Sequence, residues 1–346
     1  MRTSLMKFRV AFLCHLVLLI GAAAGFHVWN AWHRPAGNGI FPQAVIVEEG
    51  MTARAIARKL AETRVVSDET DFYVFSVITG NAHKLQAGEY RLSPFFTPAQ
   101  ILDHLSRGRI VTHRVTFPEG STVDDVARIL AESGLARRER VLELAGDRAF
   151  LDSLEIDAPS LEGYLFPDTY TFRKSQAEES ILRRMVQTFR KNFPEALRDH
   201  AAQRGLTVHD TVILASLVEK EAMVDEERPL IAAVFFNRLL KDMPLQSDPT
   251  AVYDIPGFNG PITRHHLERE TPYNTYTRTG LPAGPICNPG KKSLEAVLNP
   301  ADVPYLYFVS NNDGTHSFSV SYSEHLRAVK QYRERLGASS GDSEGS

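Results

Sequence analysis

The stretch Leu214–Glu227, LASLVEKEAMVDEE, places two glutamates inside an otherwise apolar pattern with helical spacing. They are Glu219 and Glu221. A carboxylate held against apolar side chains is costly to ionise, so its pKa rises. A carboxylic acid that keeps its proton near neutral pH can donate that proton to a leaving group. The stretch therefore predicts a helix that carries a candidate acid catalyst.

The two glutamates differ in their position around this helix. At about 100° per residue, Glu221 falls on the apolar face and Glu219 points away from it. The apolar face consists of Leu214, Leu217 and Val218, and Glu219 points toward Val212, Ala215 and Met223. Glu221 is therefore the better candidate acid. The alternative is that Glu221 is a structural acid paired with Arg228 or Arg238, because ion pairs also perturb pKa values.

The composition describes an ordinary folded protein with two or three domains. The chain has 346 residues and a net charge of −3. It has no basic block, which argues against nucleic acid as a partner. His265 and His266 are adjacent and face different directions, and the chain has no H-E-x-x-H motif, Gly-rich phosphate loop or G-x-S-x-G elbow. The sequence thus predicts neither a metal nor a cofactor.

The N-terminal part has the pattern of a membrane anchor. A short basic segment, residues 1–9, precedes an apolar run at 10–31. About twenty apolar residues can span a bilayer, and the leading positive charge predicts that residues 1–9 stay in the cytoplasm. A linker follows at 32–40. The alternative is a cleaved signal peptide, because Ala22–Ala24 offers small residues for cleavage, but the run continues to Trp29, which favours an anchor.

The rest of the chain predicts an α+β fold in two parts. Residues 41–111 form a small α+β module, and residues 112–336 form a mixed α+β domain that contains the glutamate-bearing helix. A weak repeat relates Val45–Val66 to Val115–Ala136, each a strand, an E-G turn and a helix. Residues 337–346 are rich in Gly and Ser and predict a disordered tail.

Local signals place the elements inside these parts. Thr97 and Gln100 predict a capping box for a helix at 97–107. Asn-Asn-Asp-Gly at 311–314 predicts a hairpin between strands at 305–310 and 317–321. Apolar periodicity predicts further helices at 122–133, 138–145, 177–192, 194–204, 207–223, 227–241 and about 323–336.

The loop-rich region 243–300 holds most candidate substrate residues, because long loops in compact domains usually carry function. The candidates are Gln246, Asp248, Tyr253, Asn274 and Tyr276. Tyrosine rings can stack on sugar faces, and amides can bind an N-acetyl group. The alternative is that these residues only form turns. A second motif, LEGYLFPDTY at 161–170, combines three aromatic residues with Glu162 and Asp168, and its alternative is a packed aromatic corner.

Several motifs in a fixed order resemble the YceG-like family, the MltG-type endolytic murein transglycosylases of bacteria. The resemblance covers nearly the whole chain. It is carried by LEGYLFPDTY, ASLVEKEA, VFFNRL, LQSDPTAVY, YNTYTRTGLPAGPICNPG, PYLYFVS and HSFS.

The resemblance implies a single-pass protein of the bacterial inner membrane, with a LysM-like module at 41–111 and its catalytic domain in the periplasm. It implies cleavage of the MurNAc-GlcNAc bond within nascent peptidoglycan strands, which leaves 1,6-anhydro ends. It also implies a terminase role beside peptidoglycan synthases. The catalytic acid would be the second glutamate of E-K-E, Glu221. Substrate contact or support would come from Glu219, Gln246, Asp248, Tyr253, Asn274 and Tyr276.

Two other functions remain compatible with the residues. A peptidoglycan-binding scaffold of the wall-synthesis complex would not depend on Glu221. A hydrolytic muramidase would use the same acid with water and would leave reducing ends.

Overall fold

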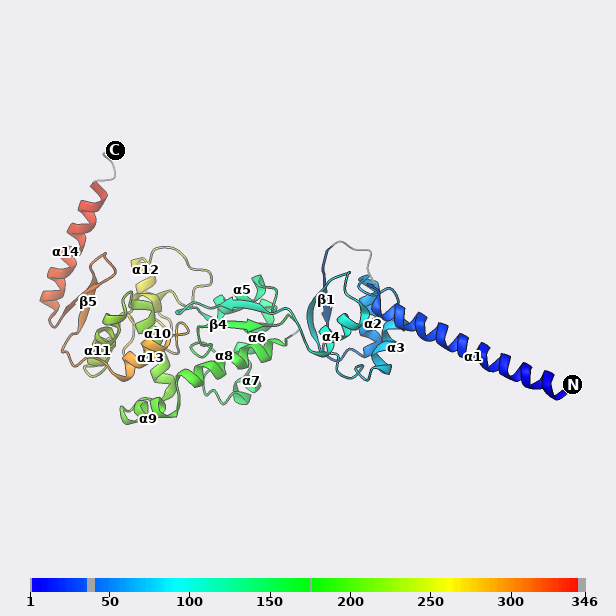
Figure 1. The fold of residues 1–346 in the computed structure, drawn as a ribbon. Helices are drawn as coiled ribbons and strands as arrows, with labels where there is room; N and C mark the ends of the chain where they lie inside the picture. The colour runs from blue at the N-terminus through cyan, green and yellow to red at the C-terminus, as the bar shows by residue number, and fades with distance from the viewer. Residues whose placement is uncertain (1, 36–40, 175, 342–346) are drawn as a thin grey trace. The chain divides into compact units, whose positions relative to one another are not determined.

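The computed structural model describes residues 2–35, 41–174 and 176–341, and its chain separates into two compact units (Figure 1). The first unit runs to His113 and includes Thr171–Gln176. The second contains Arg114–Tyr170 and the chain from Ala177 onward. The sequence placed this division between 111 and 112. Most of the linker predicted at 32–40 lies outside the described residues.

The first unit is a two-stranded antiparallel sheet packed with helices. Val45 lies opposite Tyr90 in this sheet, and both are buried. Side chains alternate along the first strand, so Val45 and Val47 enter the core while Ala44 and Ile46 face outward. The elements of the unit are α1 (Arg2–His33), β1 (Gln43–Val47), α2 (Ala53–Glu62), α3 (Glu69–Ile78), β2 (Gly88–Leu92) and α4 (Pro98–Ser106).

Side-chain caps fix where the helices of this unit begin. The Thr52 hydroxyl accepts a hydrogen bond from the Ala55 backbone at 3.2 Å. Thr97 and Gln100 form the predicted capping box, with distances of 2.9 and 3.2 Å. Each cap satisfies backbone N–H groups that have no partner inside the helix. The prediction of a helix beginning after Thr97 is therefore confirmed.

The predicted anchor at 10–31 lies within α1. The end of this helix packs on α3 and α4, and the Trp32 ring lies 4.5 Å from the Phe75 ring. Among the helices that the structure describes, none combines the length and the apolar character needed to cross a membrane.

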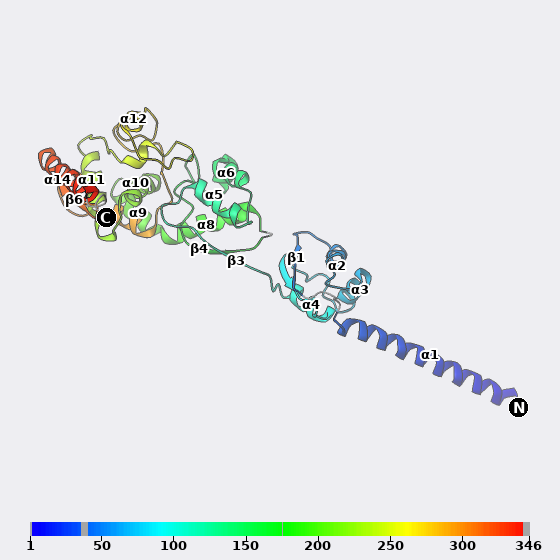
Figure 2. The ribbon, with the colours of Figure 1, turned by 90° about the horizontal axis from the view of Figure 1, so that it is seen from above.

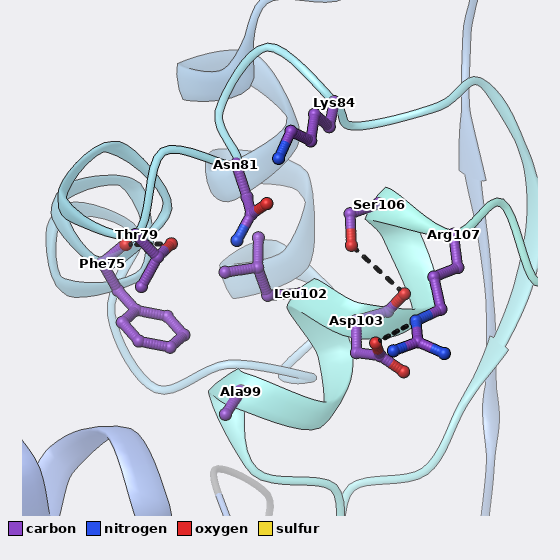
Figure 3. A pocket seen from close by; sticks show the side chains of 9 residues that line it. All are labelled: Phe75, Thr79, Asn81, Lys84, Ala99, Leu102, Asp103, Ser106 and Arg107. Atoms are coloured by element: carbon purple, nitrogen blue, oxygen red, sulfur yellow. Dashed lines mark hydrogen bonds and ion pairs between the residues drawn. The ribbon is translucent and has the colours of Figure 1, made fainter.

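A cavity of about 460 Å³ lies between α3 and α4 of the first unit (Figure 3). Phe75 and Leu102 contribute apolar surface to it, and Asn81 and Lys84 contribute polar groups. Asp103 and Arg107, one turn apart at the end of α4, also line the cavity and form an ion pair, with 2.6 Å between Oδ1 and Nε. The cavity thus combines an aromatic ring with charged groups of both signs.

The second unit is mainly helical, and α10 packs against α9, α11 and α13 (Figures 1 and 2). Two antiparallel strands near its C-terminal end, β5 and β6, pair Phe308 with Phe318. Beyond α10 the chain includes two short 3-10 helices, η1 (Asp225–Glu227) and η2 (Asp248–Ala251). The remaining elements are β3 (His113–Thr116), α5 (Val123–Glu132), α6 (Arg138–Gly146), α7 (Arg148–Ser153), β4 (Thr169–Phe172), α8 (Glu178–Asn192), α9 (Glu195–Gln203), α10 (Val208–Glu221), α11 (Arg228–Leu239), α12 (Arg264–Leu267), α13 (Lys291–Leu298), β5 (Tyr307–Ser310), β6 (His316–Ser319) and α14 (Tyr322–Gly341).

The end of the chain differs from the prediction. The sequence placed a disordered tail at 337–346, yet α14 continues to Gly341. Lys330 and Glu334 pair at i,i+4 with 3.9 Å between Nζ and Oε1, which is a favourable spacing on a helix surface. Residues 342–346 lie outside the described residues.

Candidate active site

The helix α10 runs through the core of the second unit, and its last turn lies at a loop-rich surface. Every side chain from Thr211 to Val218 is buried. The polar members of this stretch are satisfied, because Thr211 Oγ1 donates to the Thr207 carbonyl at 2.9 Å and Ser216 Oγ donates to the Ile213 carbonyl at 2.7 Å. The sequence had expected one apolar face. From Thr211 to Val218 the helix is instead buried on all sides, so the wheel alone does not separate the two glutamates.

Glu221 is the last residue of α10, and it is partly buried. Its Oε1 accepts a hydrogen bond from Ser247 Oγ at 2.5 Å. The pKa of Glu221 is raised to about 7, chiefly by burial and also by the neighbouring Asp248 charge, while the Ser247 hydrogen bond and the Arg238 charge oppose the rise. At neutral pH this carboxyl group can therefore give up or take back a proton.

Glu219 has different surroundings, although it lies only two residues earlier. Its side chain is 6% exposed and forms an ion pair with Arg228, with 3.1 Å between Oε1 and Nη1. Its Oε2 accepts hydrogen bonds from Ser293 Oγ at 2.8 Å and from the Gly290 backbone at 2.9 Å. Glu219 thus holds α10, α11 and the start of α13 together. The ion pair with Arg228 that was considered for Glu221 belongs to Glu219.

The loop that carries Ser247 is fixed by a network of threonines. The Ser247 backbone donates to Thr275 Oγ1 at 3.0 Å, and the two hydroxyls of Thr250 and Thr275 lie 2.9 Å apart. Thr250 Oγ1 also donates to the Ser247 carbonyl at 2.6 Å. Ser247, Thr250 and Thr275 are each at most 1% exposed. The hydroxyl that contacts Glu221 is therefore held in place before any ligand arrives.

Arg238 of α11 also holds the loop that carries Ser247 in place. Its guanidinium donates to the carbonyls of Pro244 and Leu245 at 3.1 and 2.9 Å and to Gln246 Oε1 at 3.1 Å. Gln246 itself is exposed and has a positive φ of 50°, a left-handed conformation that is costly for a residue with a side chain. The Arg238 contacts stabilise this turn. Sequence reasoning considered Arg238 only as an ion-pair partner and missed this role.

Asp248 and Tyr276 form a pair beside Glu221. The Tyr276 hydroxyl donates to Asp248 Oδ1. Burial and the Asp248 carboxylate both raise the pKa of Tyr276, so the phenol keeps its proton. Asp248 is exposed and Tyr276 is partly exposed. Both side chains are therefore accessible to a ligand at the surface next to the acid.

Asn274 is fully buried, so it lies beneath the surface of the site and not on it. Its amide nitrogen donates to the backbone carbonyls of Leu267 and Arg269 at 3.0 and 2.6 Å. Its Oδ1 accepts from the Tyr276 backbone at 3.0 Å. Of the two roles expected for Asn274, these contacts fit support of the loop that presents Tyr276.

A cavity of about 810 Å³ adjoins the site, and its lining includes Lys220 and Pro249, the chain neighbours of Glu221 and Asp248. Tyr253 and Glu162 also line it, and the Tyr253 hydroxyl donates to Glu162 Oε2 at 2.8 Å. The pKa of Glu162 is raised to about 7 by burial, against the hydrogen bonds from Val123 and Tyr253, which oppose the rise. Sequence reasoning noted Glu162 only as one of two carboxylates in a motif.

The remaining candidate residues do not belong to this site. Asp168 is exposed, and its carboxylate accepts a hydrogen bond from the Thr169 backbone at 2.6 Å. His316, in the HSFS motif, pairs with buried Glu227, with 2.7 Å between Nδ1 and Oε2. Within the described ranges, no group of three or more His, Cys, Asp or Glu side chains is arranged to hold a metal ion.

Comparison with known proteins gives consistent matches over most of the chain. The model of the YceG-like family matches residues 45–331. An endolytic murein transglycosylase of Bacillus subtilis is 32% identical over 302 residues, which covers 83% of this chain and 83% of that protein. An endolytic murein transglycosylase of Streptococcus pneumoniae is 28% identical over 359 residues, which covers 94% of this chain and 65% of that protein.

A solved structure extends the comparison to the fold. The crystal structure of a yceG-like protein from Listeria monocytogenes superposes with a TM-score of 0.58 and 34% sequence identity. The alignment covers 84% of this chain and 99% of that chain. The family model spans both units, and the region that it matches includes the glutamate-bearing helix and its loops. The chain therefore belongs to the YceG-like family.

Proposed function

We propose that this chain is a lytic transglycosylase that cleaves peptidoglycan strands internally at the MurNAc-GlcNAc bond. The observation that carries the proposal is Glu221, a partly buried carboxyl with a pKa of about 7 at the end of a core helix. The names of the relatives from Bacillus and Streptococcus support the same activity.

In the proposed mechanism, Glu221 acts first as an acid. Its proton passes to the glycosidic oxygen, the bond from that oxygen to C1 of the muramic sugar breaks, and GlcNAc leaves with a free hydroxyl. Positive charge develops at C1, where the N-acetyl carbonyl or surrounding dipoles stabilise it. Glu221 is now a carboxylate, and the hydrogen bond from Ser247 at 2.5 Å stabilises that form.

Glu221 then acts as a base. It takes the proton from the C6 hydroxyl of the muramic sugar while that oxygen bonds to C1, which closes a 1,6-anhydro ring and restores the acid. No water takes part in these steps, so one carboxyl group suffices where hydrolytic glycosidases use two. A group that works in both directions needs a pKa near the working pH.

The glycan strand is proposed to run along the surface formed by the 810 Å³ cavity and the Asp248–Tyr276 pair. Tyr253 offers an aromatic face on the cavity, and its ring packs 4.7 Å from the Tyr273 ring. Aromatic rings suit the apolar faces of sugars, and Gln246 and Asp248 offer exposed polar groups beside them.

The end group of the product tests the proposal. The full chain is incubated with polymerised, uncross-linked peptidoglycan strands, and the fragments are analysed by mass spectrometry. We expect 1,6-anhydro ends on internal fragments. Reducing ends would identify a hydrolytic muramidase instead, and strands that bind without being cut would identify a binding scaffold.

The cleavage rate is expected to depend on pH through Glu221. The acid form is needed for the first step, so the rate should be highest below pH 7 and fall about tenfold per pH unit above it. Initial rates from pH 5 to pH 9 measure this limb. A rate that is flat between pH 7 and pH 9 would exclude Glu221 as the group that limits cleavage.

The variant Ser247→Ala provides the matched control for the pH profile. Ser247 stabilises the carboxylate form, so its loss should raise the pKa of Glu221. A hydrogen bond to a charged group is worth enough to move the alkaline limb upward by about one pH unit. An unchanged limb would show that Ser247 does not tune the acid.

The cellular setting is also a proposal. We propose that α1 holds the chain at the bacterial inner membrane and that both units lie in the periplasm, where the enzyme acts as a terminase beside peptidoglycan synthases. Large apolar side chains of α1 support this, since Val17, Leu18 and Leu19 are each more than 60% exposed. Protease added to spheroplasts should digest both units, and protection of the units would contradict the proposal.

We further propose that the first unit is a LysM-like module that contacts glycan. Its order β1-α2-α3-β2 and the cavity beside Phe75 and Lys84 support this role (Figure 3). Lys84→Ala should weaken retention of the full chain on insoluble peptidoglycan, and unchanged retention would count against the role.

A further inference from the structure

Glu162 is a buried carboxylate that takes no part in the proton-transfer steps proposed for Glu221. It is 5% exposed and lines the 810 Å³ cavity together with Tyr253. Cavity walls of this kind are usually built from side chains that need few hydrogen bonds, because a buried carboxylate is costly unless its oxygens are satisfied. A carboxylate in this position therefore calls for a reason beyond packing.

Glu162 is satisfied by donors from separate parts of the chain. The Val123 backbone at the start of α5 donates to both carboxylate oxygens, at 3.1 and 3.2 Å. The Asn288 amide donates to Oε1 at 3.3 Å, and the Tyr253 hydroxyl donates to Oε2 at 2.8 Å. A carboxylate is the side chain best able to accept all of these hydrogen bonds at once.

Two of the donors belong to a rigid frame. Asn288 is 1% exposed, donates a second hydrogen bond to the Ser121 carbonyl at 2.8 Å, and accepts one from the Leu165 backbone at 2.8 Å. Val123 is the first residue of α5, and that helix is held by a capping box at Thr122. Glu162 therefore has a fixed position before it contacts Tyr253.

Tyr253 is the donor that lies on the long loop. It follows η2, is partly exposed, and lines the cavity. Its hydroxyl is occupied by Glu162, and one side of its ring packs near Tyr273 at 4.7 Å between centroids. The Glu162 contact therefore limits the ring to one orientation on the cavity wall.

We propose that Glu162 is a positioning residue that fixes the Tyr253 ring as a stacking platform for one pyranose of the glycan strand. The proposal rests on the proposed function, because it assumes that a glycan occupies this cavity. A ring held in advance loses less side-chain entropy when a sugar binds, so its orientation contributes directly to affinity. Glu162 acts through Tyr253 and does not touch the reacting atoms.

The test measures glycan affinity in the full chain carrying Glu221→Gln, which should bind uncross-linked glycan oligomers without cutting them. Glu162→Gln and Tyr253→Phe are each expected to weaken binding about tenfold, as for loss of a charge-assisted hydrogen bond. The double variant should bind no more weakly than the weaker single variant, because both changes remove the same contact. Asp168→Asn, a change of the exposed carboxylate in the same motif, should leave affinity unchanged.

Additive losses in the double variant would overturn the proposal, because Glu162 and Tyr253 would then act independently. Equal affinity of Tyr253→Phe and the parent would overturn it as well. If Glu162→Gln does not fold, Tyr253→Phe is compared with Tyr253→Ala, and similar losses support a role for ring orientation. Failure of the Glu221→Gln parent to bind any glycan would instead overturn the proposed function itself.

Discussion

Glu221→Gln is expected to reduce cleavage of glycan strands by about 10²–10⁴-fold, the usual contribution of a positioned general acid–base. Glutamine has nearly the same shape, and its carbonyl oxygen can still accept the hydrogen bond from Ser247 Oγ. It cannot donate a proton to a glycosidic oxygen or take one from a hydroxyl. The measurement is the initial rate of release of 1,6-anhydro fragments by full-length parent and variant.

The stability of the same variant should separate a catalytic loss from a folding loss. The folded-state pKa of Glu221 is about 7, above its ordinary value of 4.5. The contribution of Glu221 to the stability of the parent is therefore fully present below about pH 4.5 and is lost as pH rises through 7, since the buried carboxyl must then ionise. Glu221→Gln lacks this dependence, so its melting temperature at pH 8 should equal or exceed that of the parent.

Glu226→Gln is the matched control, because it makes the same chemical change five residues later on an exposed side chain. It should retain the parent's rate. If Glu221→Gln kept more than a tenth of the parent's rate and Glu226→Gln kept the full parent rate, Glu221 would not be the acid, and the proposed mechanism would fail.

The sequence pointed to Glu221 as the candidate acid, a role that stays a prediction, but it did not give the surroundings of that residue. The apolar residues around the E-K-E triplet indicated that a carboxyl there would be hard to ionise. The different surroundings of Glu219 and Glu221 depend on Ser293 and Ser247, which lie 74 and 26 residues away along the chain. Helical periodicity contains no information about partners at such separations.

Prediction from the sequence was limited in the same way for the loop residues. The sequence marked Asn274 and Tyr276 as candidate substrate residues in a loop-rich region, and both surface contact and loop support were open for either residue. The structure separates them, because Asn274 is fully buried and bonded to backbone carbonyls, while Tyr276 remains partly exposed. Burial of a polar residue is set by the whole packed unit rather than by its neighbours in sequence.

Elements with strong local signals were the most predictable parts of the fold. The capping box at Thr97 and the hairpin turn at 311–314 needed only nearby residues, and both are present. The tail at 337–346 was judged by Gly and Ser content, yet α14 extends through Gly341. Composition is a weak guide where a preceding helix with charged i,i+4 pairs can continue.

Glu219→Gln is expected to destabilise the second unit by about 3 kcal/mol while leaving cleavage per folded molecule within a few fold of the parent. Removing one partner of a buried ion pair leaves the other charge uncompensated, which typically costs about 3–5 kcal/mol. The lower end applies here because Arg228 keeps a second acidic partner, Asp225, with 3.0 Å between Nε and Oδ1. Equilibrium unfolding in urea measures the change.

The control for this prediction is Glu268→Gln, which removes the partner of Arg264 in a pair whose side chains are 61% and 90% exposed. Exposed pairs contribute little, so its unfolding midpoint should match that of the parent. A Glu219→Gln variant that is as stable as the parent but inactive would move Glu219 from structural support into the chemistry. The expected result, reduced stability with preserved turnover, would instead assign the two glutamates of one helical turn to two separate tasks: Glu219 holds the helices together, and Glu221 transfers the proton.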